Sequence, residues 1–299
     1  MVRYFGKERN QELLSLTANT RLLGLLGYPV EHSLSAVMHN RAFTHLGLDC
    51  VYLPFSVQPA NLAAAVEAIR ALGMLGANVT IPHKEKVMDY LDEVTEDAQA
   101  AGAVNTIHHQ RGRLVGHNTD GLGFIRSMQE ETGLSPQKKT IVLVGAGGAA
   151  RGVGVALGRS GARLIYIANR TIERAARVAQ DIQDNSGVSV EIVELSPVKL
   201  KPVLEQAQIL VHASAVGMHP HADVPPLVPP ELLHQGLLVC DLVYRPRETS
   251  LIKAAQQRGC RVLPGWGMLV YQGAAAFELW LGQPAPVEVM RAAVLEHLG

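Results

Sequence analysis

Short apolar runs alternate with amphipathic segments in the first part of the chain. Residues 22–27, 50–57 and 76–80 form apolar runs that end at turn residues, which predicts strands of a buried sheet. Between them, residues 35–46 and 61–72 carry apolar side chains at three- and four-residue spacing, which predicts crossover helices. Strands and helices in alternation indicate an α/β unit with a mainly parallel sheet.

A hairpin is predicted to close this first unit. Residues 106–110 and 113–118 flank a short Arg-Gly turn, which predicts two antiparallel strands that end near Asp120. Two helical patterns at the C-terminus, 268–281 and 287–298, have no strand after them. We therefore expect these last helices to return to the first unit.

A second alternating series lies between these segments. Six apolar runs predict strands at 140–144, 163–168, 188–193, 208–213, 237–242 and 261–263. Helical patterns such as 149–160 and 174–183 separate several of them, which predicts a doubly wound parallel sheet of the Rossmann type. The fold class is then α/β with two domains: a substrate domain of residues 1–119 plus 266–299, and a dinucleotide-binding domain of residues 120–265.

Composition narrows the classes of partner. The 299 residues are 47% apolar, and 27 basic residues balance 27 acidic ones, so no net positive field attracts nucleic acid or an anionic membrane. We therefore expect small-molecule partners, with monomer and homodimer both left open. Residues 1–21 lack the apolar core of a signal peptide or a membrane span, so we expect a cytoplasmic location. The three cysteines lie far apart, so we expect no metal site.

A glycine-rich turn follows the strand predicted at 140–144. Its residues are Gly145, Ala146, Gly147, Gly148 and Ala149. Glycines in such a turn let a pyrophosphate approach the backbone at the start of the next helix, although turns of this kind also occur for packing alone. The strand before it and the helix after it favour a dinucleotide site.

The end of the next predicted strand carries no acidic residue for the ribose hydroxyls of NAD. Asn169, Arg170 and Thr171 stand there instead, and Arg174 follows at the start of a helix. Two guanidinium groups beside a helix N-terminus suit a phosphate dianion, although surface arginines are often simply solvated. The pattern predicts NADP as the cofactor.

Polar side chains gather at the predicted strand ends of the first unit. Ser33 and Ser35 lie where a helix begins, one of them as the expected N-cap, and together they predict a carboxylate site. Asn78, Thr80 and Lys84 follow the strand at 76–80, at the edge of an open α/β sheet where ligands bind.

The junction between the two predicted domains adds further polar groups. Asn105 supplies an amide and Asp120 a carboxylate. Clefts between domains are favoured sites for small ligands.

Several motifs, in one order along the chain, resemble the shikimate dehydrogenase family. They are Ser33-Leu34-Ser35, Asn78-Val79-Thr80, Lys84, Ala103-Val104-Asn105-Thr106, Asn118-Thr119-Asp120, Gly145 to Ala149, Asn169-Arg170-Thr171, Asp241-Leu242-Val243-Tyr244, and Gly267-Met268-Leu269 through Gln272. The resemblance implies reduction of 3-dehydroshikimate to shikimate with NADPH, in the chorismate pathway to aromatic amino acids.

The resemblance also implies roles for individual residues. Ser33 and Ser35 would take the substrate carboxylate, with Tyr244 near it. The ring hydroxyls would contact Asn78, Thr80, Asn105, Asp120 and Gln272. Leu242 and Gly265 match positions that line the nicotinamide.

Lys84 and Asp120 are the candidate catalytic residues. Hydride addition builds negative charge on the ketone oxygen, and an ammonium group can stabilise that charge and give up a proton. We therefore expect Lys84 to act as the general acid. Asp120 is expected to lie beside it and to orient its ammonium group, although an ordinary interdomain ion pair would have the same composition.

One segment departs from the family pattern. His212-Ala213-Ser214-Ala215-Val216 stands where the family usually shows Asn and Thr before a Gly-Met pair. We expect His212 to be a hydrogen-bonded histidine at a strand end, with replacement of the family's amide donor as the alternative. Two other functions stay open: a quinate or dual quinate/shikimate dehydrogenase, and a catalytically silent dinucleotide-binding sensor.

Overall fold

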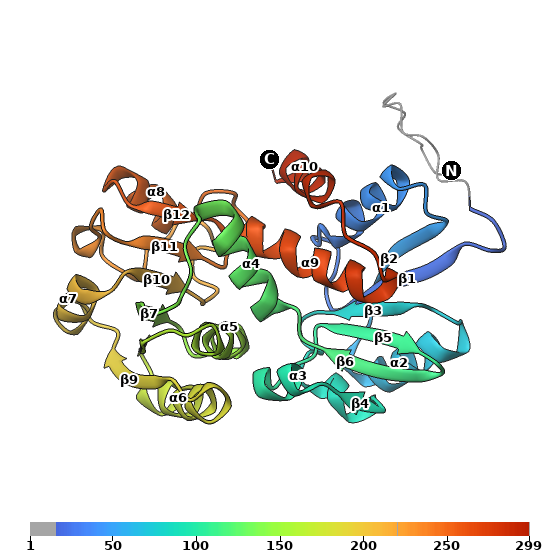
Figure 1. Ribbon diagram of the computed structural model, residues 1–299, viewed down its shortest axis with the longest axis horizontal. Coiled ribbons are helices and arrows are strands. Elements are labelled where there is room, and N and C mark those ends of the chain that lie inside the picture. The colour runs from blue at the N-terminus through green and yellow to red at the C-terminus, as the bar shows by residue number, and fades with distance from the viewer. Residues whose placement is uncertain (1–15, 220, 299) are drawn as a thin grey trace.

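Two six-stranded sheets, each flanked by helices, form the two halves of the molecule (Figure 1). The computed structural model describes residues 16–219 and 221–298. Residues 1–15, which belong to the segment where we expect no signal peptide or membrane span, lie outside this part. Among the helices described, none is long and apolar enough to cross a membrane.

The first sheet has the strand order β2-β1-β3-β5-β6-β4. Its strands are β1 (Arg21–Gly27), β2 (Cys50–Ser56), β3 (Gly76–Val79), β4 (Glu93–Val94), β5 (Thr106–Gln110) and β6 (Arg113–His117). Its helical segments are α1 (Ser35–His45), η1 (Pro59–Asn61), α2 (Leu62–Ala71), η2 (Lys86–Tyr90) and α3 (Glu96–Ala101). Only β5 runs antiparallel to its neighbours, so the predicted mainly parallel sheet with a hairpin is confirmed.

The second sheet is parallel throughout, in the order β12-β11-β10-β7-β8-β9. Its strands are β7 (Thr140–Val144), β8 (Leu164–Asn169), β9 (Ser189–Glu194), β10 (Ile209–His212), β11 (Leu238–Asp241) and β12 (Arg261–Leu263). The helices of this half are α4 (Asp120–Thr132), α5 (Gly148–Arg159), α6 (Ile172–Ser186), α7 (Pro197–Gln206), η3 (Pro230–Leu232) and α8 (Ser250–Gln257). The strand order reverses between β7 and β10, which confirms the doubly wound sheet and sets its switch point there.

The last two helices, α9 (Gly265–Leu281) and α10 (Val287–His297), return to the first half (Figure 1). Phe277 and Met290 share one buried cluster with Leu23 of β1 and Phe43 of α1, so the predicted return is confirmed. By contrast, Phe124 of α4 is buried with the strands of the second sheet. These separate cores support our proposal that the domains divide at residues 119/120 and 265/266.

Helices α4 and α9 cross closely at the junction of the two halves. A Cβ atom at Gly123 would lie 2.5 Å from the backbone nitrogen of Gln272. Only glycine allows this approach. The crossing therefore sets Gln272 on α9 beside the first turn of α4, which begins at Asp120.

Candidate active site

Lys84 and Asp120 form an ion pair at the junction of the two halves. Lys84 Nζ lies 2.6 Å from Asp120 Oδ2, with the two side chains 30% and 21% exposed. The expected pairing is therefore confirmed. The carbonyl of Lys84 accepts the N–H of Val104 at 2.8 Å, which ties the segment after β3 to the one before β5. Partial burial lowers the local dielectric, so the pair orients the ammonium group more strongly than it could in water.

Asn105 holds the carboxylate of this pair. Its Nδ2 donates to Asp120 Oδ1 at 2.8 Å and to Thr119 Oγ1 at 2.9 Å. Its Oδ1 accepts the backbone N–H of Thr119 at 2.8 Å, so the amide cannot flip without losing these bonds. Asn105 is only 2% exposed. The position of Asp120 is thus set by a buried amide rather than by Lys84 alone.

Asn78 and Tyr52 extend the network beneath the site. Asn78 Nδ2 donates to the carbonyl of Asn105 at 3.1 Å and to Thr106 Oγ1 at 3.0 Å. Its Oδ1 accepts the hydroxyl of Tyr52 at 2.8 Å. With both N–H groups used, Asn78 can offer a ligand only an acceptor. Sequence analysis missed Tyr52, although a tyrosine inside a buried strand needs a partner for its hydroxyl, and that need was the available signal.

Ser33 and Ser35 lie together at the start of α1. Ser33 Oγ donates to Ser35 Oγ at 3.2 Å and accepts the backbone N–H of Ser35 at the same distance. The prediction that one serine caps the helix is wrong, because Leu34 is the N-cap residue and makes no side-chain bond. Burial raises the pKa of Tyr52, and the nearby Ser35 hydroxyl opposes the rise. Ser35 therefore lies next to the tyrosine that contacts Asn78.

The remaining predicted substrate residues surround this network. Gln272 Oε1 accepts from Asn105 Nδ2 at 3.4 Å, and its Nε2 donates to the carbonyl of Leu269 at 2.9 Å. Tyr244 comes from the second half but packs against the core of the first, and burial raises the pKa of its hydroxyl. Thr80 points its methyl group at Gly27. Among the described residues, Thr80 and Tyr244 have no side-chain hydrogen bond to the network.

The glycine-rich turn lies at the switch point, where β7 ends. Gly145 has φ +121°, and a Cβ atom there would lie 2.8 Å from the carbonyl oxygen of Ala213. Gly147, the N-cap of α5, has no atom within 4 Å of its Cβ position, and no side chain caps this helix. Ala146 packs on the core, while Gly148 and Ala149 are exposed. The open backbone N–H groups of this helix start fit a pyrophosphate.

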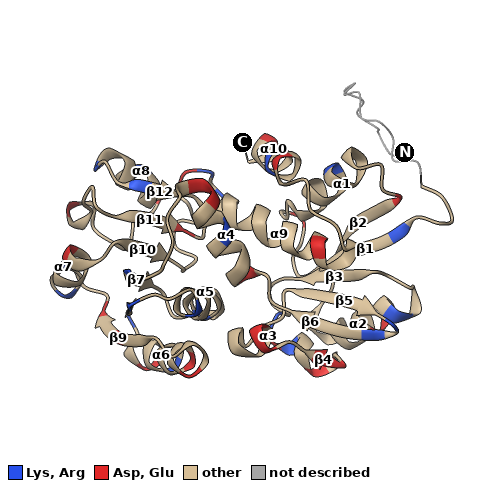
Figure 2. Cartoon of the chain, viewed as in Figure 1, with Lys and Arg blue, Asp and Glu red and all other residues tan. Residues whose placement is uncertain are grey.

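Arg170 and Arg174 lie beyond the end of β8, and both side chains are exposed. In the part of the chain that the structure describes, neither forms an ion pair. Asn169 Nδ2 donates to the carbonyl of Thr171 at 2.8 Å, and α6 begins at the next residue without a side-chain cap. Basic and acidic residues occur on both halves of the molecule (Figure 2).

Leu242 and Gly265 meet at the carboxyl end of the second sheet. A Cβ atom at Gly265 would lie 2.5 Å from the carbonyl oxygen of Leu242, so the two segments are in close backbone contact. The N–H of Leu242 donates to the carbonyl of His212 at 2.9 Å. The structure thus brings both predicted nicotinamide-lining positions to the same edge as the glycine-rich turn.

No group of three or more potential metal ligands occurs within residues 16–219 and 221–298. The three cysteines, Cys50, Cys240 and Cys260, are free and buried.

Family models match three parts of the chain. Residues 25–107 match the shikimate dehydrogenase substrate binding domain, and residues 127–220 match shikimate / quinate 5-dehydrogenase. Residues 265–295 match the shikimate 5'-dehydrogenase C-terminal domain. The matched segments include strands of both sheets and most of the two returning helices, whereas β6, β11 and β12 lie outside them.

Individual relatives are similar over nearly the whole chain. A shikimate dehydrogenase (NADP(+)) of Methanopyrus kandleri is 51% identical over 285 residues, which cover 95% of this chain and 98% of the relative. A crystal structure of a shikimate dehydrogenase in complex with NADP+ is 42% identical with a TM-score of 0.89, covering 95% of this chain and 98% of that one. A quinate dehydrogenase from Corynebacterium glutamicum in complex with NAD is 33% identical with a TM-score of 0.85, covering 93% and 99%. The chain belongs to the shikimate dehydrogenase family.

Proposed function

We propose that this protein is an NADP-dependent shikimate dehydrogenase, which interconverts 3-dehydroshikimate and shikimate in the chorismate pathway to aromatic amino acids. The observation that carries the proposal is the network of Lys84, Asp120 and Asn105 at the junction of the two sheets. An enzyme of this kind needs a proton donor between its substrate and its cofactor domains. Lys84 supplies that donor on one side, and the open glycine-rich turn supplies a cofactor cradle on the other.

Lys84 acts as general acid in ketone reduction. NADPH supplies the hydride when it is bound. As negative charge develops on the substrate oxygen, the ammonium of Lys84 stabilises it and then transfers a proton from Nζ. Asp120 accepts a hydrogen bond from Nζ throughout, so the lysine enters the reaction charged and correctly oriented. In the reverse direction, the neutral amine of Lys84 removes the proton from the alcohol.

The remaining side chains bind and orient the ring. Ser33 and Ser35 take the carboxylate at the start of α1, with Tyr244 beside it. Asn78 accepts a hydrogen bond from a ring hydroxyl, because Tyr52 occupies only one lone pair of its Oδ1. Thr80, Asn105, Asp120 and Gln272 complete the polar wall, as their motifs in the family imply. These contacts fix the ring so that its ketone faces Lys84.

The carboxyl edge of the second sheet would hold the cofactor. The helix start at Gly147 and Gly148 would bind its pyrophosphate, and Arg170 and Arg174 would bind its 2'-phosphate. Leu242 and Gly265 would line the nicotinamide. We also propose a cytoplasmic location, which the three free, buried cysteines support because disulfides are rare in that compartment.

Steady-state assays separate this function from its rivals. The purified protein is assayed with shikimate and with quinate, each with NADP and with NAD, by following the absorbance of the reduced nicotinamide cofactor. The proposal predicts the highest kcat/KM for shikimate with NADP. Equal or greater kcat/KM with quinate would assign the protein to the dual or quinate class. Tight NADPH binding without turnover of either acid would identify a catalytically silent sensor.

A further inference from the structure

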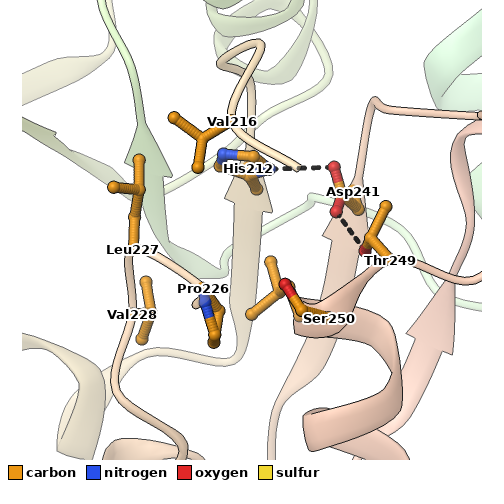
Figure 3. A pocket seen from close by; sticks show the side chains of 9 residues that line it. His212, Val216, Pro226, Leu227, Val228, Asp241, Thr249 and Ser250 are labelled. Atoms are coloured by element: carbon orange, nitrogen blue, oxygen red, sulfur yellow. Dashed lines mark hydrogen bonds and ion pairs between the residues drawn. The ribbon is translucent and has the colours of Figure 1, made fainter. Parts of the chain in front are cut away.

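His212 and Asp241 form a buried pair at the ends of adjacent strands. They are register partners in β10 and β11, and His212 Nδ1 lies 2.9 Å from Asp241 Oδ1. Both are nearly inaccessible, at 3% and 1% exposure. Figure 3 shows the pair beside a small cavity, with Thr249 on the other side of the carboxylate. The expectation that His212 is a satisfied strand-end histidine is confirmed.

The surrounding hydrogen bonds determine which ring nitrogen of His212 carries the proton. Thr249 Oγ1 donates to Asp241 Oδ2 at 2.6 Å, and the N–H of Val243 donates to Asp241 Oδ1 at 3.0 Å. A carboxylate only accepts, so Nδ1 of His212 carries a proton toward it. In the neutral ring, Nε2 then accepts the hydroxyl of Ser214 at 2.6 Å. Ser214 Oγ in turn accepts the N–H of Val216 at 3.3 Å, so a continuous chain of bonds runs from β11 into the loop after β10.

This loop faces the cofactor edge of the sheet. Ala213 lies between His212 and Ser214, and its carbonyl oxygen is 2.8 Å from the Cβ position of Gly145 in the glycine-rich turn. The other end of the network reaches Val243, next to Leu242 at the predicted nicotinamide wall. One buried pair therefore connects both segments that border the nicotinamide end, whereas Arg170 and Arg174 lie at the end of β8, on the far side of β7 from β10.

We propose that His212 is a positioning residue for the nicotinamide half of NADP: with Asp241 it holds Ser214 and the 213–217 loop against the glycine-rich turn. The inference rests on the proposed function, because it assumes that the cofactor lies along this edge. His212 acts through the loop and not on the reacting atoms. Its ring is long enough to bond Asp241 and Ser214 at once.

Binding of whole and partial cofactor tests this role. NADPH and adenosine 2',5'-bisphosphate, which lacks the nicotinamide half, are titrated against the unmodified protein, His212→Ala and Ser214→Ala. Each substitution removes at least one hydrogen bond of the series that links Asp241, His212, Ser214 and Val216. NADPH should therefore bind about tenfold more weakly, and kcat should fall by a similar factor. Affinity for the bisphosphate should fall by no more than about twofold, because its 2'-phosphate binds at Arg170 and Arg174, on the far side of β7 from the 213–217 loop. The double variant should be no worse than His212→Ala, since both act through one chain of bonds.

Two matched substitutions control for general damage. His234→Ala removes a histidine that precedes β11 and bonds the carbonyl of Leu204. Ser250→Ala removes a serine that lines the same cavity as His212 but bonds the carbonyl of Val224. Both should retain normal NADPH affinity. Ser214 is partly exposed, so Ser214→Ala tests the proposal even if His212→Ala does not fold. Equal weakening of NADPH and bisphosphate, or no weakening of NADPH by Ser214→Ala, would overturn the inference. Because binding is measured without substrate, a wrong assignment of shikimate would leave this result readable.

Discussion

Removing the two arginines after β8 should abolish the preference for NADP. Arg170→Gln and Arg174→Gln each delete a guanidinium that is exposed and has no ion-pair partner among the described residues, so neither change should disturb the fold. A hydrogen bond to a charged group contributes about 1.5–3 kcal/mol. Solvent exposure favours the lower figure, so each single variant should lose about tenfold in kcat/KM with NADP, and the double variant about a hundredfold.

The assay compares kcat/KM for NADP and NAD in the two single variants and the double variant. Values with NAD should change little, because NAD carries no 2'-phosphate. Arg177→Gln is the matched control, since it removes the same charge from an exposed position further along α6. The unmodified enzyme should lose NADP affinity as salt increases, and the double variant should lose most of that dependence. Unchanged KM for NADP in the double variant would refute the assignment of the phosphate site.

Two further predictions concern packing and pH. Gly123→Ala should lower the melting temperature and raise KM for shikimate. Its Cβ atom would lie 2.5 Å from the backbone nitrogen of Gln272, and overpacking of this kind costs about 1–3 kcal/mol. Gly152→Ala should have neither effect, because the nearest atom to its Cβ position is 3.7 Å away. Burial lowers the pKa of His39 from 6.5 to about 3, so its contribution to stability is complete above pH 6.5 and is lost as pH falls toward 3. Between pH 7 and pH 5, the free energy of unfolding measured with urea should fall by about 2 kcal/mol more in the unmodified protein than in His39→Leu. An equal fall in the two proteins would contradict this.

The fold was predictable where periodicity is long enough to read. The strands at 140–144 and 261–263 were predicted to the residue, because each is a short, mostly apolar run. By contrast, β4 has two residues and α3 has six, which is too short for a periodic pattern. Helix α4 was also not predicted. It contains Gly121 and Gly123, which disfavour an isolated helix, and these glycines make sense only once the neighbouring helices are known to approach so closely.

The candidate site was predictable where residues follow strand ends. Lys84 and Asp120 could be paired from the sequence because the motifs that contain them resemble those of the family. Tyr52 could not, because its hydroxyl reaches Asn78 across a sheet whose strand order the sequence does not reveal. The same limit hid the contact of His212 with Asp241, which depends on the register of β10 and β11. Contacts that depend on which strands are neighbours could therefore be identified only from the structure.

Turnover by a Lys84 variant tests the mechanism most directly. The charge of Lys84 matters most when the carbonyl oxygen becomes alkoxide-like, so its loss should appear in kcat more than in KM. Lys84→Ala should lower kcat by about two to four orders of magnitude, the usual contribution of a positioned acid–base group. Asp120→Asn should also slow turnover, with less than additive loss in the double variant. Lys86→Ala, which removes an exposed lysine paired with Asp89 at 2.6 Å, should leave both constants unchanged. Near-normal kcat with only a raised KM for shikimate in Lys84→Ala would make Lys84 a binding residue and contradict the mechanism.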